Sequence, residues 1–342
     1  MQQCLADSEQ LTVKFDWIEV TIKDLSPKKI IENILNLSPG DFNALKAGRF
    51  GYNHQIRWNR GNVSLLYNVS NGHYAEDEMG VHLLITGSGC DALASELPLR
   101  DLISLVVGGS KYKFTRIDLA IDDRQERLLR MNRVQHYANR GLFTSRWNNR
   151  LEINKLRNSD NQGIGKTIYF GSKRSTLYCR FYDKSLEQRQ KYHNDRKRLK
   201  RVPKHWTRLE VVFKKERANL LIEHLVKNYR VGLVIRQVLN NYLRFLRLGT
   251  DQHKHRRETA DWWNQFIGSV SKLKLTTKPD NPSIEKMTSW LDRQITPTIA
   301  TVMKAHDGEL NWLFKMITEA KSRMKRKHLD AIAQYRAKKL KG

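Results

Sequence analysis

Residues 11–214 repeat one pattern, in which short runs of β-branched and aromatic residues are separated by turn-forming residues. Runs of this kind are typical of β-strands. Helical stretches such as Lys28–Leu37 and Cys90–Leu97 lie between some of them, without strict alternation of strand and helix. This order predicts an α+β domain, a mostly antiparallel sheet with flanking helices. The expected strands are Phe15–Ile22, Val63–Tyr67, Val81–Thr86, Phe114–Asp123, Lys166–Gly171, Tyr178–Lys184 and Thr207–Phe213.

The pattern changes after Lys215. Apolar residues then recur at three- and four-residue steps from Val231 to Leu246, which indicates an amphipathic helix. A further helix is expected from Trp262, and others over Ile284–Ile295 and Leu310–Leu340. We therefore expect two domains, an α+β domain in residues 1–215 and an all-helical C-terminal region in residues 216–342.

The charge of the chain limits its possible partners. It has 62 Lys and Arg against 35 Asp and Glu, a net charge of +27, which favours a polyanion such as nucleic acid. Apolar residues make up 39%, enough for a core, and this argues against a disordered basic tail. No apolar run approaches the ~20 residues that span a bilayer, and no export signal is visible. The three cysteines are scattered along the chain and suggest neither disulfides nor a zinc site. We expect a cytoplasmic protein with no membrane partner.

Two segments concentrate the positive charge. Residues 188–204 hold eight Lys or Arg and residues 321–342 hold nine, each with one Asp. One such run is as consistent with a solvated helix face as with a binding surface, but two in a chain of this charge favour phosphate contacts. Ser185–Gln188 predicts a capping box that starts the first basic helix. The candidate DNA-binding residues are Arg116, Arg189, Lys191, Arg196, Lys197, Arg198, Lys200, Arg201, Lys325, Arg326 and Lys327.

Three expected strands carry ionisable side chains at every second position. In a strand, alternate side chains point to opposite faces, so each strand has one apolar and one ionisable face. A sheet with one solvated face explains any single strand. Acids, arginines and tyrosines recurring on all three strands favour a functional site instead. The ionisable set comprises Arg116, Asp118, Asp122, Tyr178, Arg180, Tyr182, Lys184, Arg208 and Glu210.

The chemistry that suits this set is phosphoryl transfer. Carboxylates are oxygen ligands for Mg²⁺ or Mn²⁺, and Arg and Lys stabilise charge on a phosphate. At ~3.3 Å per residue, Asp118 and Asp122 lie roughly 13 Å apart at Cα on a regular strand, too far to share one ion. We therefore expect one of them to join Glu210 at a divalent cation, with Asp118 preferred because it is central in its strand.

The order of the motifs resembles a known family. The set is similar to the trans-acting rolling-circle replication initiators of staphylococcal-type plasmids and their relatives in filamentous phages of the cholera-phage type. The resemblance covers roughly residues 11–300, and the helical C-terminal region favours the phage branch. The motifs are Asp16–Thr21, Gly87–Cys90, Arg116–Asp123, Thr167–Ser172, Arg180–Lys184 with Glu187, Arg208–Glu210 and Trp262–Trp263.

The resemblance implies an activity and a site. Family members nick one origin strand, leave a tyrosine joined to the 5′ phosphate, and later rejoin the strand. Tyr182 then matches the nucleophile, with Arg180 and Lys184 beside it, and Tyr178 and Tyr169 are its alternatives. The acids Asp118, Asp122 and Glu210 match the motif acids that we connect with the cation. No pair of histidines flanks a hydrophobic residue, the metal-binding pattern of other rolling-circle enzymes; the nearest is His253-Lys-His255.

The resemblance also implies partners and leaves alternatives open. Residues 1–215 would be the nicking domain and residues 216–342 a basic DNA-binding or accessory region. The partners would be origin DNA, double-stranded and locally single-stranded, a second copy of the chain, and a host helicase and polymerase. A relaxase of an integrative element would use the same chemistry. A non-catalytic DNA-binding regulator would leave the ionisable face unexplained, and an RNA-binding sheet lacks its Arg-Gly-aromatic signature.

Overall fold

The computed structural model describes residues 11–109, 111–249, 251–273, 275 and 283–339, and leaves the side chains of Lys286, Lys327, Lys338 and Lys339 undescribed. The chain forms two compact units, Met1–Thr276 and Thr277–Gly342. Within the described residues, no helix combines the length and the apolar character needed to cross a membrane.

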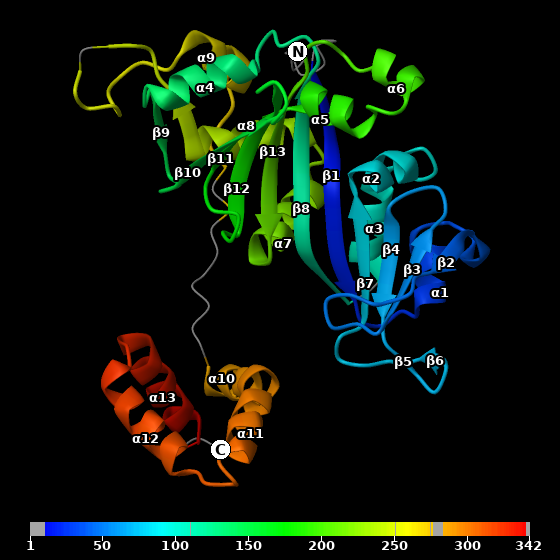
Figure 1. Ribbon diagram of the computed structural model, residues 1–342, viewed down its shortest axis with the longest axis vertical. Helices are drawn as coiled ribbons and strands as arrows, with labels where there is room; N and C mark the ends of the chain where they lie inside the picture. Colours follow the sequence, from blue (N-terminus) through cyan, green and yellow to red (C-terminus); the bar gives the residue numbers. More distant parts are fainter. Residues whose placement is uncertain (1–10, 110, 250, 274, 276–282, 340–342) are drawn as a thin grey trace. The chain divides into compact units, whose positions relative to one another are not determined.

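The first unit is built on one sheet of ten strands in the order β10-β11-β12-β13-β8-β1-β7-β4-β3-β2, with antiparallel pairing throughout (Figure 1). The α+β prediction is confirmed. The strands of this sheet are β1 (Leu11–Ile22), β2 (Phe42–Ala44), β3 (His54–Trp58), β4 (Val63–Tyr67), β7 (Val81–Thr86), β8 (Tyr112–Asp123), β10 (Arg150–Leu156), β11 (Gly163–Phe170), β12 (Leu177–Asp183) and β13 (Thr207–Lys214). Two small sheets pair β5 (Val69–Ser70) with β6 (His73–Tyr74) and β9 (Phe143–Ser145) with β14 (Leu243–Phe245).

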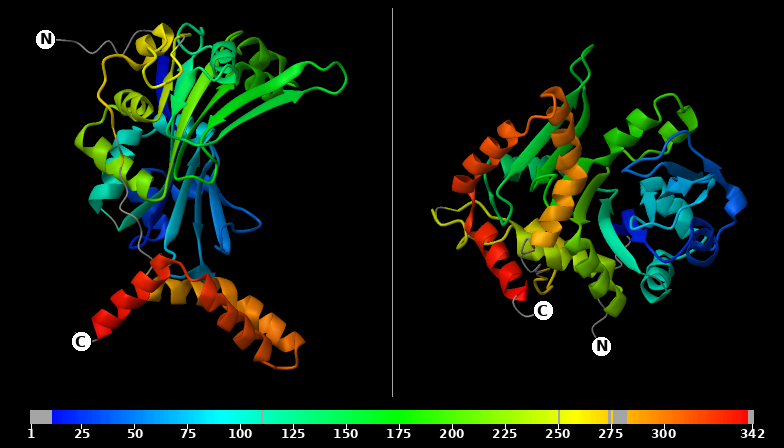
Figure 2. Two further views of the ribbon diagram at one scale, coloured as in Figure 1. Left: turned by 90° about the vertical axis from the view of Figure 1, so that its left-hand side faces the viewer. Right: turned by 90° about the horizontal axis from the view of Figure 1, so that it is seen from below.

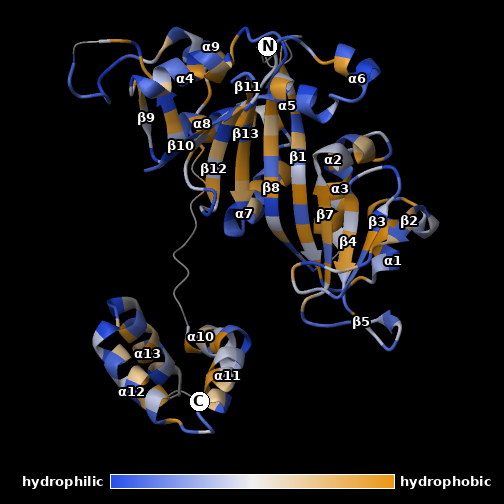
Figure 3. Ribbon diagram, in the orientation of Figure 1, coloured by the Kyte–Doolittle hydropathy of each residue, from blue (hydrophilic) through white to orange (hydrophobic). Residues whose placement is uncertain are grey.

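Helices cover one face of the ten-stranded sheet (Figure 2, left). The alternation predicted from the sequence is the cause: Ile117, Leu119 and Ile121 of β8 are buried in the main apolar core, beside Phe181 of β12 and Val211 of β13. The strands accordingly show alternating bands of hydropathy (Figure 3). The helices of this unit are α1 (Pro27–Lys29), α2 (Gly87–Ala94), α3 (Leu99–Gly109), α4 (Met131–Asn139), α5 (Lys184–Lys191), α6 (Arg196–Lys200), α7 (Glu216–Lys227), α8 (Val231–Tyr242) and α9 (Asp261–Ile267).

The boundary between the units differs from the one that we predicted at residues 215/216. Helices α7, α8 and α9 belong to the first unit, because their apolar faces complete its core. Leu221 of α7, Val238 of α8 and Trp263 of α9 are all buried there. A change from strand to helix periodicity marks a change of secondary structure, and it does not by itself mark a domain boundary.

The second unit is helical, as expected, but its helices are shorter than predicted. It contains α10 (Ile284–Trp290), a π-helical turn (Leu291–Ile295), α11 (Thr296–Ala305), α12 (Asn311–Ala320), a 3₁₀ turn (Lys321–Arg323) and α13 (Arg326–Lys339). The helix predicted over Leu310–Leu340 is thus two helices, and Leu340 lies outside the described residues. In the first unit, the helix predicted from Lys28 continues from α1 as a π-helical turn, Ile30–Ile34, followed by a 3₁₀ turn at Pro39–Asp41.

Candidate active site

Three neighbouring strands bring the predicted ionisable residues together. β13 lies between β12 and β8, and the register places Glu210 opposite Arg180 on one side and opposite Ala120 on the other. Arg208 lies opposite Tyr182 and Asp122 in the same way. Because cross-strand neighbours and their diagonals are within side-chain reach, one face of the sheet can gather all these groups.

Tyr182 and Arg180 both contact Glu210. The Tyr182 hydroxyl donates a short hydrogen bond to Oε1 of Glu210, and Nε of Arg180 donates to Oε2 at 2.6 Å. Glu210 is fully buried, and Tyr182 is only 7% exposed. A buried carboxylate that accepts from a cation and a hydroxyl has its charge compensated, so the three side chains form one polar unit.

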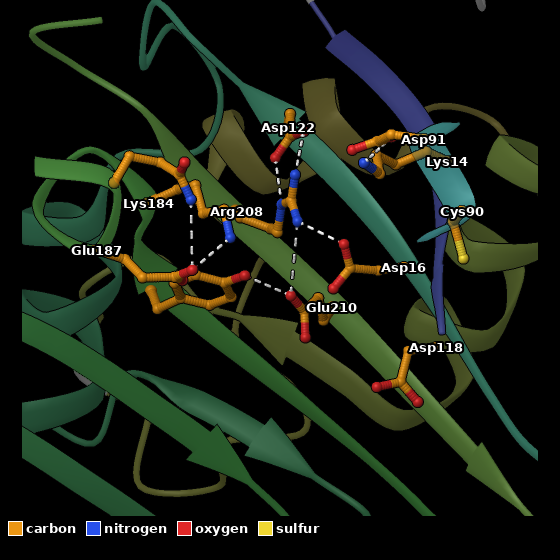
Figure 4. A network of polar contacts seen from close by, with 12 residues as sticks. Lys14, Asp16, Cys90, Asp91, Asp118, Asp122, Lys184, Glu187, Arg208 and Glu210 are labelled. Carbon is orange, nitrogen blue, oxygen red and sulfur yellow. Dashed lines mark hydrogen bonds and ion pairs between the residues drawn. The ribbon is translucent and has the colours of Figure 1, made fainter. Parts of the chain in front are cut away.

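Arg208 is the centre of the remaining acids (Figure 4). Its guanidinium donates twice to Asp122, with Nε to Oδ1 at 2.5 Å and Nη2 to Oδ2 at 2.7 Å. Its Nη1 donates to Oδ1 of Asp16 at 2.7 Å and lies 3.9 Å from Oε1 of Glu210. Trp206 adds a hydrogen bond from its indole Nε1 to Asp122 at 2.8 Å. One buried arginine therefore connects three carboxylates on three strands.

Asp16 was not among the predicted site residues. Phe15 lies opposite Leu119 and Trp17 opposite Asp118, so Asp16 is an additional residue in β1, a β-bulge. The bulge interrupts the alternation, and Asp16 of β1 reaches Arg208 of β13 across the intervening strand β8. The available sequence signal was the motif Asp16–Thr21, which the resemblance included without assigning a role to the aspartate. Gly87, at the start of α2, packs against Asp16, since a Cβ there would lie 3.4 Å from Oδ1.

Asp118, our preferred metal ligand, lies apart from this cluster (Figure 4). It faces Val212 on β13, and its carboxylate accepts two hydrogen bonds from Arg116, at 2.9 and 2.6 Å. The Arg116 guanidinium also lies over the Trp17 ring, 4.2 Å from its centroid. Arg116, predicted to bind DNA, is thus engaged with Asp118. In the ladder between β8 and β13, Ala120 lies opposite Glu210, and Asp118 is two residues away from Ala120. The carboxylate of Asp118 therefore contacts Arg116 and not the groups around Glu210.

Asp123, next to Asp122, has a structural role. Its buried carboxylate accepts hydrogen bonds from four backbone amides of the following loop, those of Gln125, Arg127, Leu128 and Leu129. Adjacent strand residues point to opposite faces, so only Asp122 of this pair reaches the site.

Burial raises the pKa values of both Tyr182 and Glu210. Burial raises the pKa of Glu210 to about 7, although Arg180 and the hydrogen bond from Tyr182 favour the carboxylate. Burial and the adjacent Glu210 raise the pKa of Tyr182 well above its ordinary value. Burial also acts to raise the pKa of Asp16, but the cations Arg208, Lys184 and Lys14 lower it overall. Glu210 is thus a base whose pKa is near neutral and which contacts a protonated hydroxyl.

A cavity of about 750 Å³ opens over this cluster, lined among others by Asp16, Arg180, Tyr182, Lys184 and Arg208. Lys184 is nearly buried, lies over the Tyr182 ring at 5.4 Å, and donates to Glu187 at 2.6 Å. Lys14 forms an ion pair with Asp91 at the same cavity. The lining is rich in cations and aromatic rings, which suits a nucleic-acid backbone and its bases.

Tyr182, among the tyrosines weighed from the sequence, is in contact with the acid cluster. Tyr178 instead packs with Tyr169, at a ring distance of 6.4 Å, and with Val212. This arrangement favours Tyr182 as the reactive hydroxyl.

The predicted basic residues lie in three places. Lys191 lines the cavity, and the others of residues 188–204 are exposed on α5, α6 and the loops beside them. Lys325 and Arg326 are exposed in the second unit, and the side chain of Lys327 lies outside the described residues. The cap of α5 differs from our prediction: Asp183, not Ser185, accepts from the backbone amide of Leu186 at 2.9 Å. Ser185 instead donates to Asp183.

In the part of the chain that the structure describes, no three His, Cys, Asp or Glu side chains stand close enough to hold a metal ion. Three carboxylates do surround Arg208, those of Asp16, Asp122 and Glu210. Asp16 and Glu210 are the two that face each other beside it.

Comparisons with known proteins relate this chain to proteins of replication initiation. Residues 112–317 match the model of a family described as replication initiation factor, and residues 12–101 match the rolling-circle replication initiation protein N-terminal domain. A putative DNA relaxase, NicK, of Bacillus subtilis is 32% identical over 325 residues, which is 92% of this chain and 87% of that protein. The solved structure of a rolling-circle replication initiator protein from Geobacillus stearothermophilus superposes with a TM-score of 0.64 and 26% identity, over 78% of this chain and 99% of that one.

A family model that spans residues 112–317 and a relative aligned over most of both chains establish the relationship. The chain belongs to the replication initiation factor family, whose rolling-circle initiators and relaxases are both represented among its relatives. The resemblance inferred from the ordered motifs is confirmed.

Proposed function

We propose that this protein nicks one strand of origin DNA through a covalent 5′-phosphotyrosine at Tyr182 and later rejoins it. The hydrogen bond from the Tyr182 hydroxyl to Glu210 is the observation that carries the proposal. A tyrosine is a weak nucleophile while it is protonated, and an adjacent base activates it. Glu210 is such a base, because burial raises its pKa to about 7, near the pH at which a general base is most effective.

The proposed step exchanges one phosphoester bond for another. The Tyr182 oxygen forms a bond to phosphorus, and the bond from phosphorus to the 3′ oxygen breaks. The phenolic proton passes to Glu210, and the 3′ oxygen takes a proton from solvent. The number of phosphoester bonds is unchanged, so the reverse reaction can rejoin the strand without another energy source.

Arg180 and Lys184 are placed to stabilise the phosphate. The Arg180 guanidinium carbon lies 5.3 Å from the centroid of the Tyr182 ring and Nζ of Lys184 lies 5.4 Å from it, and both residues line the cavity. Cations beside the attacking oxygen favour the charge that develops on the transferred phosphoryl group.

A divalent cation, Mg²⁺ or Mn²⁺, fits beside Glu210 with Asp16, in place of the Asp118 that the sequence favoured. The donor chemistry supports this, since carboxylate oxygens are the ligands that these ions prefer. The two carboxyl groups also lie within interaction distance, since each affects the pKa of the other. Asp122 would then hold Arg208 in place. When bound, the ion would polarise the scissile phosphate.

The first unit would thus be the nicking domain, with α5 and α6 supplying phosphate contacts. The second unit, with Lys325 and Arg326, would be a basic accessory region for the origin duplex, and a homodimer, a host helicase and a polymerase are further proposed partners. The exposed lysines and arginines of both units suit sequence-independent contacts that position DNA.

The test is to incubate the full chain and Mg²⁺ or Mn²⁺ with a supercoiled plasmid that carries the protein's own coding region and its flanks. Wild type should yield nicked circles and an SDS-resistant protein–DNA adduct, and mass spectrometry should place the nucleotide on Tyr182. Tyr182→Phe should bind DNA but form no adduct, whereas the matched variant Tyr178→Phe should form it. Nicking by Tyr182→Phe at the wild-type rate would contradict the proposal.

A relaxase of an integrative element is the second candidate, favoured by the 32% identity to a putative DNA relaxase. It would use the same nick on a transfer origin. Cloning the DNA around the mapped nick separates the two: an initiator makes a plasmid with that segment replicate, whereas a relaxase makes it transferable by conjugation.

A further inference from the structure

A second, smaller hollow adjoins the cavity over Tyr182. Its volume is about 260 Å³, and it shares Arg124, Gln188, Tyr192 and Trp206 with the larger cavity. The volume is just below the ~300–1,000 Å³ of pockets that take drug-sized ligands, so it suits one planar group. We propose that this hollow binds one unstacked base of the single strand whose phosphate reaches Tyr182, an inference that rests on the proposed function.

The Trp206 ring forms a rigid wall of the hollow. Its indole nitrogen donates to Asp122 at 2.8 Å, and its backbone oxygen accepts from the amide of Lys184 at 2.8 Å. The ring is therefore already oriented without any ligand. Stacking a base on it costs little additional side-chain entropy. Trp206 is only half-buried, so part of its ring is accessible from the hollow.

Aromatic and cationic groups alternate around the hollow. The Arg124 guanidinium lies 4.7 Å from the Trp206 ring centroid, and that of Arg198 lies 5.6 Å from the ring of Tyr192. A planar cation over a ring occupies the position that a base takes when it stacks. Arg124 and Arg198 are exposed, so each can withdraw to a flanking phosphate when a base enters.

Asp122 connects this hollow to the reaction site. It accepts from Trp206 and from Arg208, and Arg208 lies opposite Tyr182 across the β12–β13 ladder. A nucleotide with its base against Trp206 thus has its backbone beside the Tyr182 cavity. Unstacking a base costs less in a single strand than in a paired duplex, so this hollow would favour single-stranded DNA at Tyr182.

The test measures binding without cleavage, using the full chain in EDTA and fluorescence anisotropy. The probes are oligo(dT) of about 12 nucleotides, within the ~4–16 nucleotide range of single-strand sites, and an abasic strand of equal length. Trp206→Leu and Tyr192→Leu should weaken oligo(dT) binding by about 5- to 150-fold and leave binding of the abasic strand within about twofold. Trp206→Phe and Tyr192→Phe keep a stacking face, so they should retain most of the preference for bases.

Trp206→Phe and Trp206→Leu both lose the hydrogen bond to Asp122, but only Trp206→Phe keeps an aromatic face. If the preference for oligo(dT) over the abasic strand survives in Trp206→Phe and falls in Trp206→Leu, stacking is its cause. Equal loss of affinity for both strands in the Leu variants, or no loss for either, would overturn the base site. The adduct assay on wild type keeps the two proposals apart. An adduct at Tyr182 without any base preference overturns only the base site, whereas base preference without an adduct overturns only the nicking proposal.

Discussion

The hydroxyl of Tyr182 donates a hydrogen bond to the carboxylate of Glu210 across a diagonal of the β12–β13 ladder. Neither group meets water freely, because Tyr182 is 7% exposed and Glu210 fully buried. Burial raises the pKa of Glu210 to about 7, so in the proposed reaction this carboxylate can accept the phenolic proton.

Replacing Glu210 by Gln should remove a pH dependence of stability. The pKa of Glu210 in the folded chain, about 7, lies above that of an unfolded glutamate, so the folded state favours the protonated form. This contribution is fully present below the unfolded pKa of ~4.3 and is lost as pH rises through about 7. The difference in unfolding free energy between wild type and Glu210→Gln should therefore change by on the order of 3 kcal/mol across that window. Urea denaturation from about pH 4 to 8 measures it, and a constant difference would argue against a raised pKa.

Added Mn²⁺ should stabilise the wild-type chain through Asp16 and Glu210. A ligand that binds only the folded state at about 100 times its Kd adds ~2.7 kcal/mol, which appears as a higher Tm. Asp16→Asn and Glu210→Gln should lose most of this shift, while Asp118→Asn should keep it, because Asp118 is engaged with Arg116. The opposite ranking of Asp16→Asn and Asp118→Asn would restore Asp118 as the ligand.

Removing the Arg208 guanidinium should destabilise the fold strongly. Arg208→Met leaves the buried carboxylate of Asp122 without its cation, and breaking such a pair costs about 3–5 kcal/mol. Arg157→Met is the control, since its pair with Asp160 is about half exposed on both sides and should cost under ~1 kcal/mol. Chemical denaturation at neutral pH compares them, and similar losses for the two variants would contradict a central role for Arg208.

Basic residues of α6 should set part of the salt dependence of DNA binding. For single strands the slope of log K against log salt is about −0.7 per phosphate contact, so changing Arg196, Lys197 and Lys200 together to Gln should reduce it by up to ~2. The control changes Lys28, Lys29 and Lys227 to Gln, which removes the same charge. These lysines are exposed on α1 and α7, on the side of the sheet opposite the candidate site. Affinity titrations at several salt concentrations measure both slopes. An equal change in the two triple variants would mean that net charge alone, and no contact by α6, governs binding.

Much of the site followed from local sequence pattern. Side-chain alternation is a property of a single strand, so Tyr182, Arg180 and Glu210 could be assigned to a polar face before their strands were known to be neighbours. The amphipathic repeat of α8 and the charge of α5 and α6 are equally local, and each was recognisable from spacing and composition.

The sequence by itself determined which side chains share a face, because that depends only on the two-residue period of a strand. Only the tertiary structure decided which of them meet. The bulge at Asp16 breaks that period, and the register sets Asp118 opposite Val212 and not opposite Glu210. Helices α7 and α8 complete the core of the first unit, although the change of sequence pattern had suggested a domain boundary before them. Trp206 reaches Asp122 from 84 residues away in the chain. Such contacts arise from strand order and packing, which no local window of residues encodes.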